Sequence, residues 1–433
     1  EALNPTLNAF VAWNPDAALA QADAIDARTA AGETIGPLAG VPVGVKDLEA
    51  VAGYTTSFGS ALSAEDPPAT DDSLHVARLR AAGAIIMGKT NTPEYGHKGA
   101  TDNIPFGTTA NPWSAKHSPG GSSGGTGAAI ASGMVPLGTG SDGGGSIRIP
   151  ASLCGLSGLK PETARVPITG RTMPGSGILS CNGPMGRRTI DTAVALDAVA
   201  GPDGRDPLSL PAPPRSLTEA VVTAEPPDRV VWSPTMGFAK VDQEVLASCR
   251  AAVDALAAAG TEVIEIDEIF PEDPVTAWLV LWGVARFKAQ GHLLGTDDWD
   301  RLSPSIQPQI EYGATVSGVD YARAHDACYE LNWRLEEAFE QAPLILTPTN
   351  AGQPPLLGQD GEVDGEAEVG WVRFTYGINM TRNPAGTVCT GLTEAGTPIG
   401  LQIIGRHFAE DEVLAAMAAA ETVIGFDQRP PGY

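Results

Sequence analysis

The sequence is short of cysteine, of basic residues and of long apolar runs, and each shortage excludes a class of protein. Its five cysteines are scattered, with no CxxC pair and no histidine spaced for zinc, so we expect a reduced cytoplasm and no structural metal. Only 27 lysines and arginines stand against 52 aspartates and glutamates, and the net charge of −25 repels phosphate backbones and anionic membranes. The longest uncharged apolar stretch near the middle, Ala277 to Ala285, is far shorter than the roughly 20 residues that a membrane span needs. We therefore expect neither a nucleic-acid partner nor a membrane partner.

The chain does contain enough apolar residues for a full core. With 433 residues, 42% of them hydrophobic, it suits one large domain or two ordinary ones, and disordered and fibrous classes are excluded. Because the chain starts at Glu1 without methionine, we expect that an upstream segment has been removed, and a targeting peptide could have been lost with it.

Short apolar runs alternate with longer amphipathic stretches along the chain. This alternation predicts an α/β fold, with its layers built around a mostly buried sheet. The expected strands are residues 42–47, 84–89, 229–234, 261–267, 343–349 and 398–405, and the expected helices are residues 72–83, 241–259, 317–340 and 409–423.

Two segments between these elements are rich in glycine or proline. Residues 202–227 contain seven prolines, which argues against a regular element and predicts a connector between lobes. Residues 351–370 carry five acidic side chains and predict a solvated loop, with a metal site as the less favoured interpretation.

The most informative stretch is rich in glycine and serine and runs from Ser118 to Ser152. A flexible linker is disfavoured because apolar anchors interrupt it, and glycines in an ordered segment must serve a backbone need. We reject its GxGxxG pattern as a dinucleotide site, because neither a helix nor a suitably spaced acidic residue follows, and no GxxxxGK[ST] loop is present. Gly120, Ser122 and Gly124 spell the GxSxG of an α/β-hydrolase, which would need a later acidic residue and then a histidine. That mechanism stays a less favoured alternative.

A longer pattern covers the whole stretch. It consists of GGSSGGTGAAIA, six residues, and then GTGSDGGGSIRIPA, and it resembles end to end the signature of the amidase signature family of serine hydrolases. GVPVGVKD (40–47), GKTNTPE (88–94) and GTPIGLQIIGRHFAEDEVLAAM (396–417) extend the similarity over nearly the entire chain. The resemblance implies the amidase signature fold, an α/β fold with a central mixed β-sheet covered by helices on both faces. It implies a single domain over residues 1–433 whose N-terminal helical segment is missing, with a more variable, partly helical substrate-pocket lobe at 210–340.

The resemblance also implies a Ser-cisSer-Lys triad. Ser146 is the expected nucleophile, Ser122, on a cis peptide bond, is the expected proton relay, and Lys46 is the expected base. A serine hydroxyl must lose its proton as it attacks a carbonyl carbon. Lys46 can take that proton only when neutral, so its pKa has to be lowered from about 10.4, and burial on an apolar strand would achieve this. No metal, nucleotide, catalytic histidine or other cofactor is required.

The residues around the expected nucleophile have implied roles as well. The N–H groups of Gly143, Gly144, Gly145 and Ser146 are expected to form an oxyanion hole, where one well-placed donor contributes about 3 kcal/mol in the transition state. Three residues are expected to support the loop, Ser123 through hydrogen bonds and Asp142 with Arg148 through an ion pair or backbone capping.

The pocket residues are predicted from weaker signals. Trp278 and Trp282 are four residues apart and share a helical face, which favours core packing and leaves an acyl or aryl pocket as the alternative. Further candidates are His117, Thr101 to Phe106, Met173, and Trp371 to Tyr376.

We expect an amidase that forms an acyl-enzyme with small or medium, uncharged, partly apolar or aryl amides, with some esterase activity. Carbamate or urethane hydrolysis by the same triad is one alternative. A glutamine-dependent amidotransferase subunit that serves a tRNA-bound partner is another, and the acidic charge disfavours it. A catalytically silent binding or scaffold homologue is the alternative from a different class. The expected partner is a small-molecule amide or carbamate, and a homodimer is left open.

Overall fold

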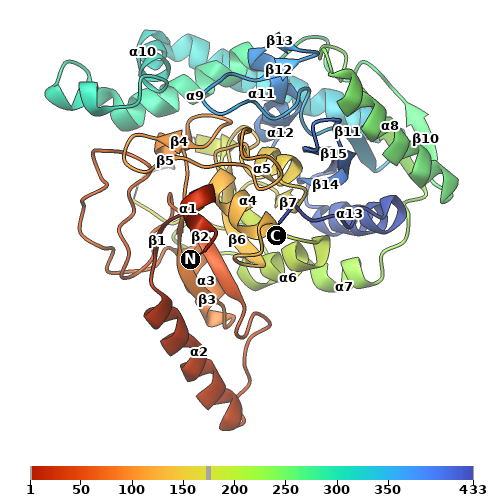
Figure 1. The fold of residues 1–433 in the computed structure, drawn as a ribbon. Coiled ribbons are helices and arrows are strands. Elements are labelled where there is room, and N and C mark those ends of the chain that lie inside the picture. Colours follow the sequence, from red (N-terminus) through yellow and green to blue (C-terminus); the bar gives the residue numbers. More distant parts are fainter. Residues whose placement is uncertain (1, 172–176, 433) are drawn as a thin grey trace.

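The protein is built around one mixed β-sheet of eleven strands. The computed structural model describes residues 2–171 and 177–432. The sheet has the order β1-β3-β2-β6-β8-β7-β14-β15-β11-β9-β10. The edge strand β1 is antiparallel to β3. Strands β3, β2 and β6 are parallel to one another, as are β11, β9 and β10, and the middle of the sheet is antiparallel from β6 to β11 (Figure 1). The strands of the main sheet are β1 (Phe10–Trp13), β2 (Pro42–Lys46), β3 (Ile85–Thr90), β6 (Leu137–Asp142), β7 (Ser157–Lys160), β8 (Cys181–Gly186), β9 (Arg229–Trp232), β10 (Glu262–Glu265), β11 (Leu344–Pro348), β14 (Ala385–Leu392) and β15 (Pro398–Gly405).

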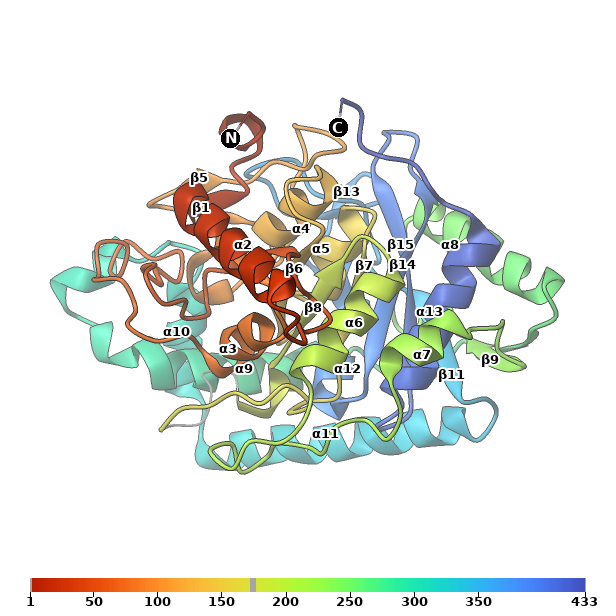
Figure 2. The same ribbon diagram turned by 90° about the horizontal axis from the view of Figure 1, so that it is seen from below.

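Helices cover both faces of this sheet. Side chains alternate between the two faces along a strand, so in β11 Leu344 and Leu346 join one apolar cluster while Ile345 joins the other. Helices α6, α7 and α13 lie below the sheet in Figure 1 and on the viewer's side of it in Figure 2, whereas α9, α10 and α11 lie on the other side. The helices are α1 (Asn4–Leu7), α2 (Pro15–Ala30), α3 (Leu74–Ala81), α4 (Gly124–Ala131), α5 (Arg148–Leu153), α6 (Thr189–Val199), α7 (Leu217–Val222), α8 (Gln243–Ala258), α9 (Val275–Gln290), α10 (Gln307–Thr315), α11 (Gly318–Phe339), α12 (Arg373–Thr381) and α13 (Glu410–Ile424).

The smaller elements lie in the connections between these helices and strands. They are the hairpins β4 (Asp102–Asn103) with β5 (Gly107–Thr108) and β12 (Glu362–Val363) with β13 (Glu366–Ala367), and the short 3₁₀ turns η1 (Glu94–Gly96), η2 (Gly177–Leu179), η3 (Gly291–Leu293), η4 (Asp297–Arg301) and η5 (Val369–Val372).

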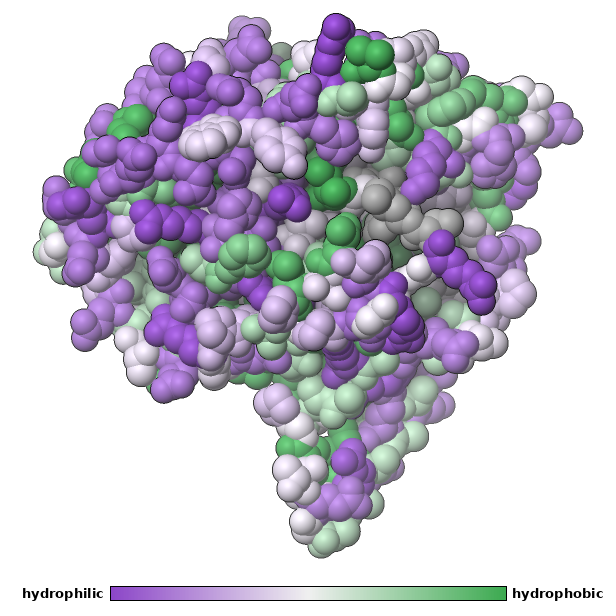
Figure 3. Space-filling view, turned by 180° about the vertical axis from the view of Figure 1, so that it is seen from behind, coloured by the Kyte–Doolittle hydropathy of each residue, from purple (hydrophilic) through white to green (hydrophobic). Residues whose placement is uncertain are grey.

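Helix α2 projects from the body, as both Figure 1 and the opposite face in Figure 3 show. The face in Figure 3 is mostly hydrophilic, with apolar residues scattered over it. In the described ranges, no helix is long and apolar enough to cross a membrane.

The predicted α/β fold with a central mixed sheet is confirmed, and each predicted strand and helix has a counterpart. One prediction was wrong, because residues 202–227 contain the regular helix α7. No proline occurs between Pro214 and Pro226, and the Ser216 side chain caps the helix by accepting from the N–H of Glu219. The acidic segment 351–370 is largely exposed between residues 358 and 368, as predicted for a solvated loop, although it also forms the hairpin of β12 and β13. Within the described ranges, no three His, Cys, Asp or Glu side chains are grouped so that they could hold a metal ion.

Candidate active site

Lys46 is the last residue of β2, and its side chain is completely buried. The neighbouring Val43 and Val45 are buried as well and join one apolar cluster, so the lysine sits at the end of a strand that water does not reach. The Lys46 amine lies within hydrogen-bond distance of two hydroxyl groups, 2.7 Å from Ser122 Oγ and 2.9 Å from Ser141 Oγ. Burial lowers the pKa of Lys46 to about 7, although the charges of Asp142 and Glu49 act in the opposite direction. At neutral pH a large share of this lysine is therefore uncharged and able to accept a proton.

Ser122 lies in the tight turn that leads into α4. The peptide bond between Gly121 and Ser122 is cis, which agrees with the prediction. Gly121 allows a close approach here, because a Cβ atom on it would lie 2.6 Å from the carbonyl oxygen of Ala100. Ser122 is 2% exposed. The turn thus presents its hydroxyl to the lysine and away from solvent.

Ser146 directly precedes Ile147, the N-cap residue of α5. It is half-buried and lines a cavity of about 500 Å³. It is the only one of the three predicted triad residues among the residues that line this cavity. Within residues 2–171 and 177–432, no hydrogen bond joins Ser122 to Ser146. The structure therefore displays the contact between Lys46 and Ser122, and the transfer between the two serines stays a proposal.

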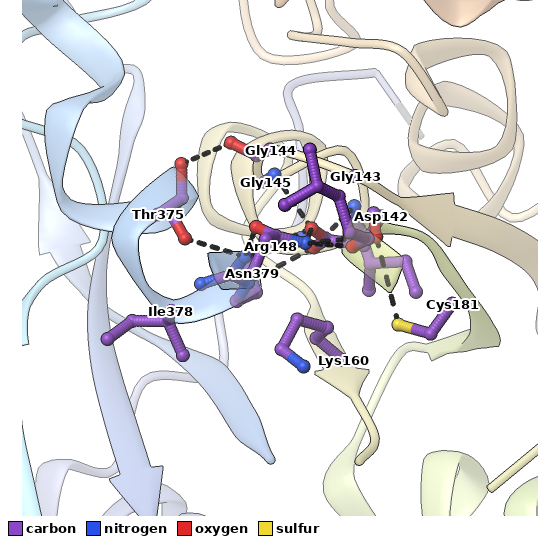
Figure 4. A network of polar contacts seen from close by, with 12 residues as sticks. Asp142, Gly143, Gly144, Gly145, Arg148, Lys160, Cys181, Thr375, Ile378 and Asn379 are labelled. Atoms are coloured by element: carbon purple, nitrogen blue, oxygen red, sulfur yellow. Dashed lines mark hydrogen bonds and ion pairs between the residues drawn. The ribbon is translucent and has the colours of Figure 1, made fainter. Parts of the chain in front are cut away.

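A buried ion pair braces the loop before Ser146. Asp142 ends β6, Arg148 begins α5, and neither side chain is exposed. Both guanidinium contacts, from Nε to Oδ2 and from Nη2 to Oδ1, measure 3.0 Å. Asn379 of α12 completes this network, which Figure 4 shows, by donating to Asp142 Oδ1 and accepting from Arg148. Burial alone would raise the pKa of Asp142, but the attraction and hydrogen bonds of Arg148 outweigh it and hold the pKa below its ordinary value.

Two predicted residues behave differently from expectation. The N–H of Gly145 donates to Asp142 Oδ1 at 2.7 Å, so it serves the bracing network and is not available to an oxyanion. Among the described residues, the buried hydroxyl of Ser123 has no hydrogen-bond partner, so the loop bond predicted for it is absent. Both differences depend on where side chains of the folded loop point, which the sequence pattern does not specify.

Aromatic side chains form one wall of the cavity. Trp278 and Trp282 of α9 stack with ring centroids 5.1 Å apart, and Tyr376 of α12 lies 5.6 Å from Trp278. All three line the same cavity as Ser146. Trp282 is also 6% exposed and packs in the core, which agrees with the favoured interpretation of the tryptophan pair, while their role in an acyl or aryl pocket stays a prediction.

The weaker pocket candidates divide into three groups. Thr101, Asp102, Trp371 and Val372 line the cavity. Residues 103–106, residues 373–375 and His117 are not among the lining residues, and Nδ1 of His117 lies 2.7 Å from the hydroxyl of Ser114. Met173 lies outside the described residues.

Comparison with known proteins decides the family. A family model described as Amidase matches residues 1–414. The chain belongs to this amidase family. An acylamidase from Rhodococcus erythropolis is 39% identical over 445 residues, which cover 100% of this chain and 91% of that protein. A subunit of a glutamyl-tRNA(Gln) amidotransferase from Chloroflexus aggregans is 32% identical over 99% of this chain and 92% of its own length.

Solved structures agree with the family assignment. A bacterial aryl acylamidase of the amidase signature family superimposes with a TM-score of 0.90 at 30% identity, covering 97% of this chain and 90% of that one. The amidase signature fold predicted from the sequence is thereby confirmed. The protein is an amide-hydrolysing enzyme.

The amidase pocket also contains residues that sequence reasoning missed. His97, Gln309 and the loop from Leu356 to Gly361 line it, although they are far apart in the sequence. Burial lowers the pKa of His97 to about 3, and its Nε2 lies 2.7 Å from the hydroxyl of Ser305. No motif or periodicity marks these positions, because they meet only through the packing of η1, α10 and the acidic loop.

Proposed function

We propose that this amidase cleaves uncharged aryl or partly apolar amides by acylating Ser146, with Ser122 as the proton relay and Lys46 as the base. The observation that carries the proposal is the 2.7 Å contact between the buried amine of Lys46 and Ser122 Oγ. A lysine acts as a base only when its pKa is brought near the working pH, and burial does this here. The match of all three positions to the family pattern supports the same assignment.

The proposed reaction begins with Ser146. Its oxygen attacks the substrate carbonyl carbon while its proton passes to Ser122, whose own proton passes to the neutral amine of Lys46. The carbonyl oxygen becomes an oxyanion that the N–H groups of Gly143, Gly144 and Ser146 stabilise. The relay then returns a proton to the departing nitrogen as the carbon–nitrogen bond breaks, leaving an ester on Ser146. Water attacks this ester with the relay again accepting the proton, and the acid product leaves.

The pocket supports an uncharged aryl or apolar substrate. The rings of Trp278, Trp282 and Tyr376, which contact one another, give the cavity an aromatic wall that suits an aryl or apolar group. Among the described lining residues, the only lysine or arginine is Lys98, and it is paired with Asp102 at 2.8 Å. A substrate carboxylate would therefore find no free cation. The names of the relatives, acylamidase and aryl acylamidase, point to the same class.

Carbamates present the same carbonyl to the same nucleophile and form a second proposed substrate class. Transamidation is the other alternative, because one relative is a subunit of an amidotransferase. The absence of a free cation among the described lining residues, together with the net charge of −25, argues against glutamine and a tRNA-bound partner.

We also propose that the protein works in the cytoplasm. The described residues contain five cysteines, all buried and unpaired, which supports the reducing cytoplasm that the sequence predicts. A homodimer remains a prediction, and light scattering coupled to size-exclusion chromatography tests it.

A substrate panel tests the proposed activity. Purified protein and Ser146→Ala are assayed with an anilide, a primary aliphatic amide, an aryl carbamate and glutamine. We expect kcat/KM to be highest for the anilide, measurable for the carbamate and negligible for glutamine, with no turnover by the variant. Efficient glutaminase activity would contradict the substrate class, and turnover by Ser146→Ala would contradict the nucleophile.

A further inference from the structure

The loop from Asp142 to Gly145 has every backbone carbonyl held by a hydrogen bond. Three of the donors are side chains of α9 and α12, and the fourth is the backbone N–H of Ile149 in α5. The contacts are Asn379 Nδ2 to Asp142 O at 3.0 Å, Trp278 Nε1 to Gly143 O at 3.0 Å, Thr375 Oγ1 to Gly144 O at 2.6 Å, and Ile149 N to Gly145 O at 2.7 Å.

Each of these contacts also fixes the direction of an N–H group. A trans peptide is planar and its C=O and N–H point in opposite directions, so holding one carbonyl orients the N–H of the next residue. The peptide between Gly144 and Gly145 illustrates this, because its carbonyl accepts from Thr375 and its N–H donates to Asp142 Oδ1 at 2.7 Å. By the same geometry, Trp278 holds the peptide that carries the N–H of Gly144, a residue that lines the cavity.

The glycines of this loop are needed because side chains of α9 and α12 contact its backbone. A Cβ atom on Gly144 would lie 2.7 Å from Cζ2 of Trp278, and one on Gly143 would lie 2.9 Å from Cζ3 of Trp282. A Cβ atom on Gly145, whose φ is +127°, would lie 2.4 Å from Thr375 Oγ1. The indole ring of Trp278 therefore lies directly on the loop and not merely near it.

We propose that Trp278 is a positioning residue for the oxyanion hole. Thr375 holds the next peptide, whose N–H is directed to Asp142, so it braces the loop without orienting an oxyanion donor. The indole N–H of Trp278 fixes the peptide between Gly143 and Gly144, so that the N–H of Gly144 is aligned before substrate binds. Donors that are aligned beforehand need no reorganisation when charge develops on the substrate oxygen. This inference rests on the proposed acylation of Ser146 and goes beyond it, because it assigns a catalytic consequence to residues outside the triad.

The same ring also lines the substrate pocket. Trp278 stacks on Trp282 and lies at a tilt of 32° to the ring of Tyr376, whose hydroxyl donates to Asp273 at 2.5 Å. A substrate ring that packs against Trp278 therefore contacts the side chain that orients the donor. This arrangement joins aryl recognition to transition-state stabilisation in one residue.

The test separates the indole N–H from the indole ring. Trp278→Phe removes the N–H and keeps an aromatic ring, and benzothienylalanine at position 278 removes the N–H with nearly unchanged shape. Thr375→Val removes the second donor, and Thr375→Ser restores it. Trp113→Phe is the matched control, because its buried indole N–H also donates to a backbone carbonyl, that of Cys154 at 2.9 Å, away from the cavity.

The readouts are kcat and KM with an anilide, and the Ki of an arylboronic acid that forms a tetrahedral adduct on the nucleophile. Loss of a whole oxyanion donor costs about 100- to 1,000-fold in kcat, so misalignment of one should cost about 10- to 100-fold. We expect this loss in kcat for both position-278 variants, with KM within about threefold and a matching rise in Ki. Thr375→Val should lower kcat by less, and Thr375→Ser should reverse that loss.

Two results would overturn the inference. One is a kcat within about twofold of wild type for the benzothienylalanine protein. The other is a loss of kcat in Trp113→Phe that equals the loss in the position-278 variants. Ser146→Ala is measured in parallel to keep the two proposals apart. Activity in that variant would refute the proposed nucleophile, whereas an inactive Ser146→Ala beside a fully active position-278 variant would refute only the role of Trp278.

Discussion

The amine of Lys46 lies 2.7 Å from the hydroxyl oxygen of Ser122, in a place that is almost closed to solvent. The same nitrogen lies 2.9 Å from Ser141 Oγ and 3.4 Å from the carbonyl oxygen of Ser141. A neutral amine has two hydrogens and one lone pair. If both hydrogens are directed to Ser141, the lone pair faces Ser122, which is the arrangement that a base requires. In this arrangement the two contacts with Ser141 direct the lone pair of Lys46 toward Ser122.

The pH dependence of the reaction should report this lysine. Only neutral Lys46 accepts a proton, so kcat/KM should rise about tenfold per pH unit below about pH 7 and level off above it. The charge of Glu49 raises the pKa of Lys46, so Glu49→Gln should move the rising limb to lower pH. A pH–rate profile of both proteins measures the shift.

Glu421 supplies the control for this profile. Burial raises its pKa to about 7 as well, but its carboxylate accepts from the backbone N–H of Thr189 and does not contact the triad. Glu421→Gln should leave the rising limb of the pH–rate profile at the wild-type pH. If the rising limb shifts in Glu421→Gln but not in Glu49→Gln, Lys46 is not the titrating base.

Lys46 and Ser122 should behave as one unit. Residues of a single relay are strongly non-additive, so Lys46→Ala and Ser122→Ala should each lower kcat by about 1,000-fold or more, and the double variant should be little worse than either. Single-turnover rates with an activated anilide measure all three proteins. Losses that simply multiply in the double variant would mean that the two residues act independently.

The ion pair of Asp142 with Arg148 should carry a large share of the stability. Asp142→Asn leaves a fully buried guanidinium without its charge partner, which typically costs about 3–5 kcal/mol. Urea unfolding at neutral pH measures the loss. Glu262→Gln disrupts an exposed pair with Arg229 and should leave the midpoint close to that of the wild type. Equal midpoints for the two variants would contradict the bracing role of Asp142.

The aromatic wall should govern selectivity for aryl substrates. Trp282→Leu removes one stacked ring and should raise the KM for an anilide about three- to tenfold, while the KM for a small aliphatic amide changes little. The exposed Trp333 of α11 is not among the lining residues and provides the control variant Trp333→Leu. Parallel increases for both substrates would mean that Trp282 acts on the fold and not on aryl binding.

Strands with apolar β-branched runs could be predicted from the sequence, and small-residue strands could not. The expected strand at residues 398–405 agrees with β15, where Ile399, Ile403 and Ile404 are buried. By contrast, β6, β7 and β8 consist largely of glycine, serine and other small residues that have low strand propensity. Close packing explains them, because a Cβ atom on Gly138 would lie 2.5 Å from Thr126 and one on Gly158 would lie 2.7 Å from Ala151. That requirement exists only in the folded chain.

The site shows the same division. The family pattern fixes the residue types and spacing of Lys46, Ser122 and Ser146, so the contact of Lys46 with Ser122 could be expected, while their roles as a triad stay a proposal. The direction of the Gly145 N–H could not, because it depends on the side chain of Asp142. Nor could Gln309 or the loop from Leu356 to Gly361, since tertiary packing alone brings them to the cavity.

The nucleophile is tested most directly by the mass of the intact protein after reaction with a fluorophosphonate probe. Wild type, Ser146→Ala and Ser122→Ala are treated side by side, with folding checked by circular dichroism. The account predicts one added phosphonyl group on wild type, none on Ser146→Ala, and much slower labelling of Ser122→Ala. Full labelling of Ser146→Ala, or no labelling of an active wild-type enzyme, would contradict it.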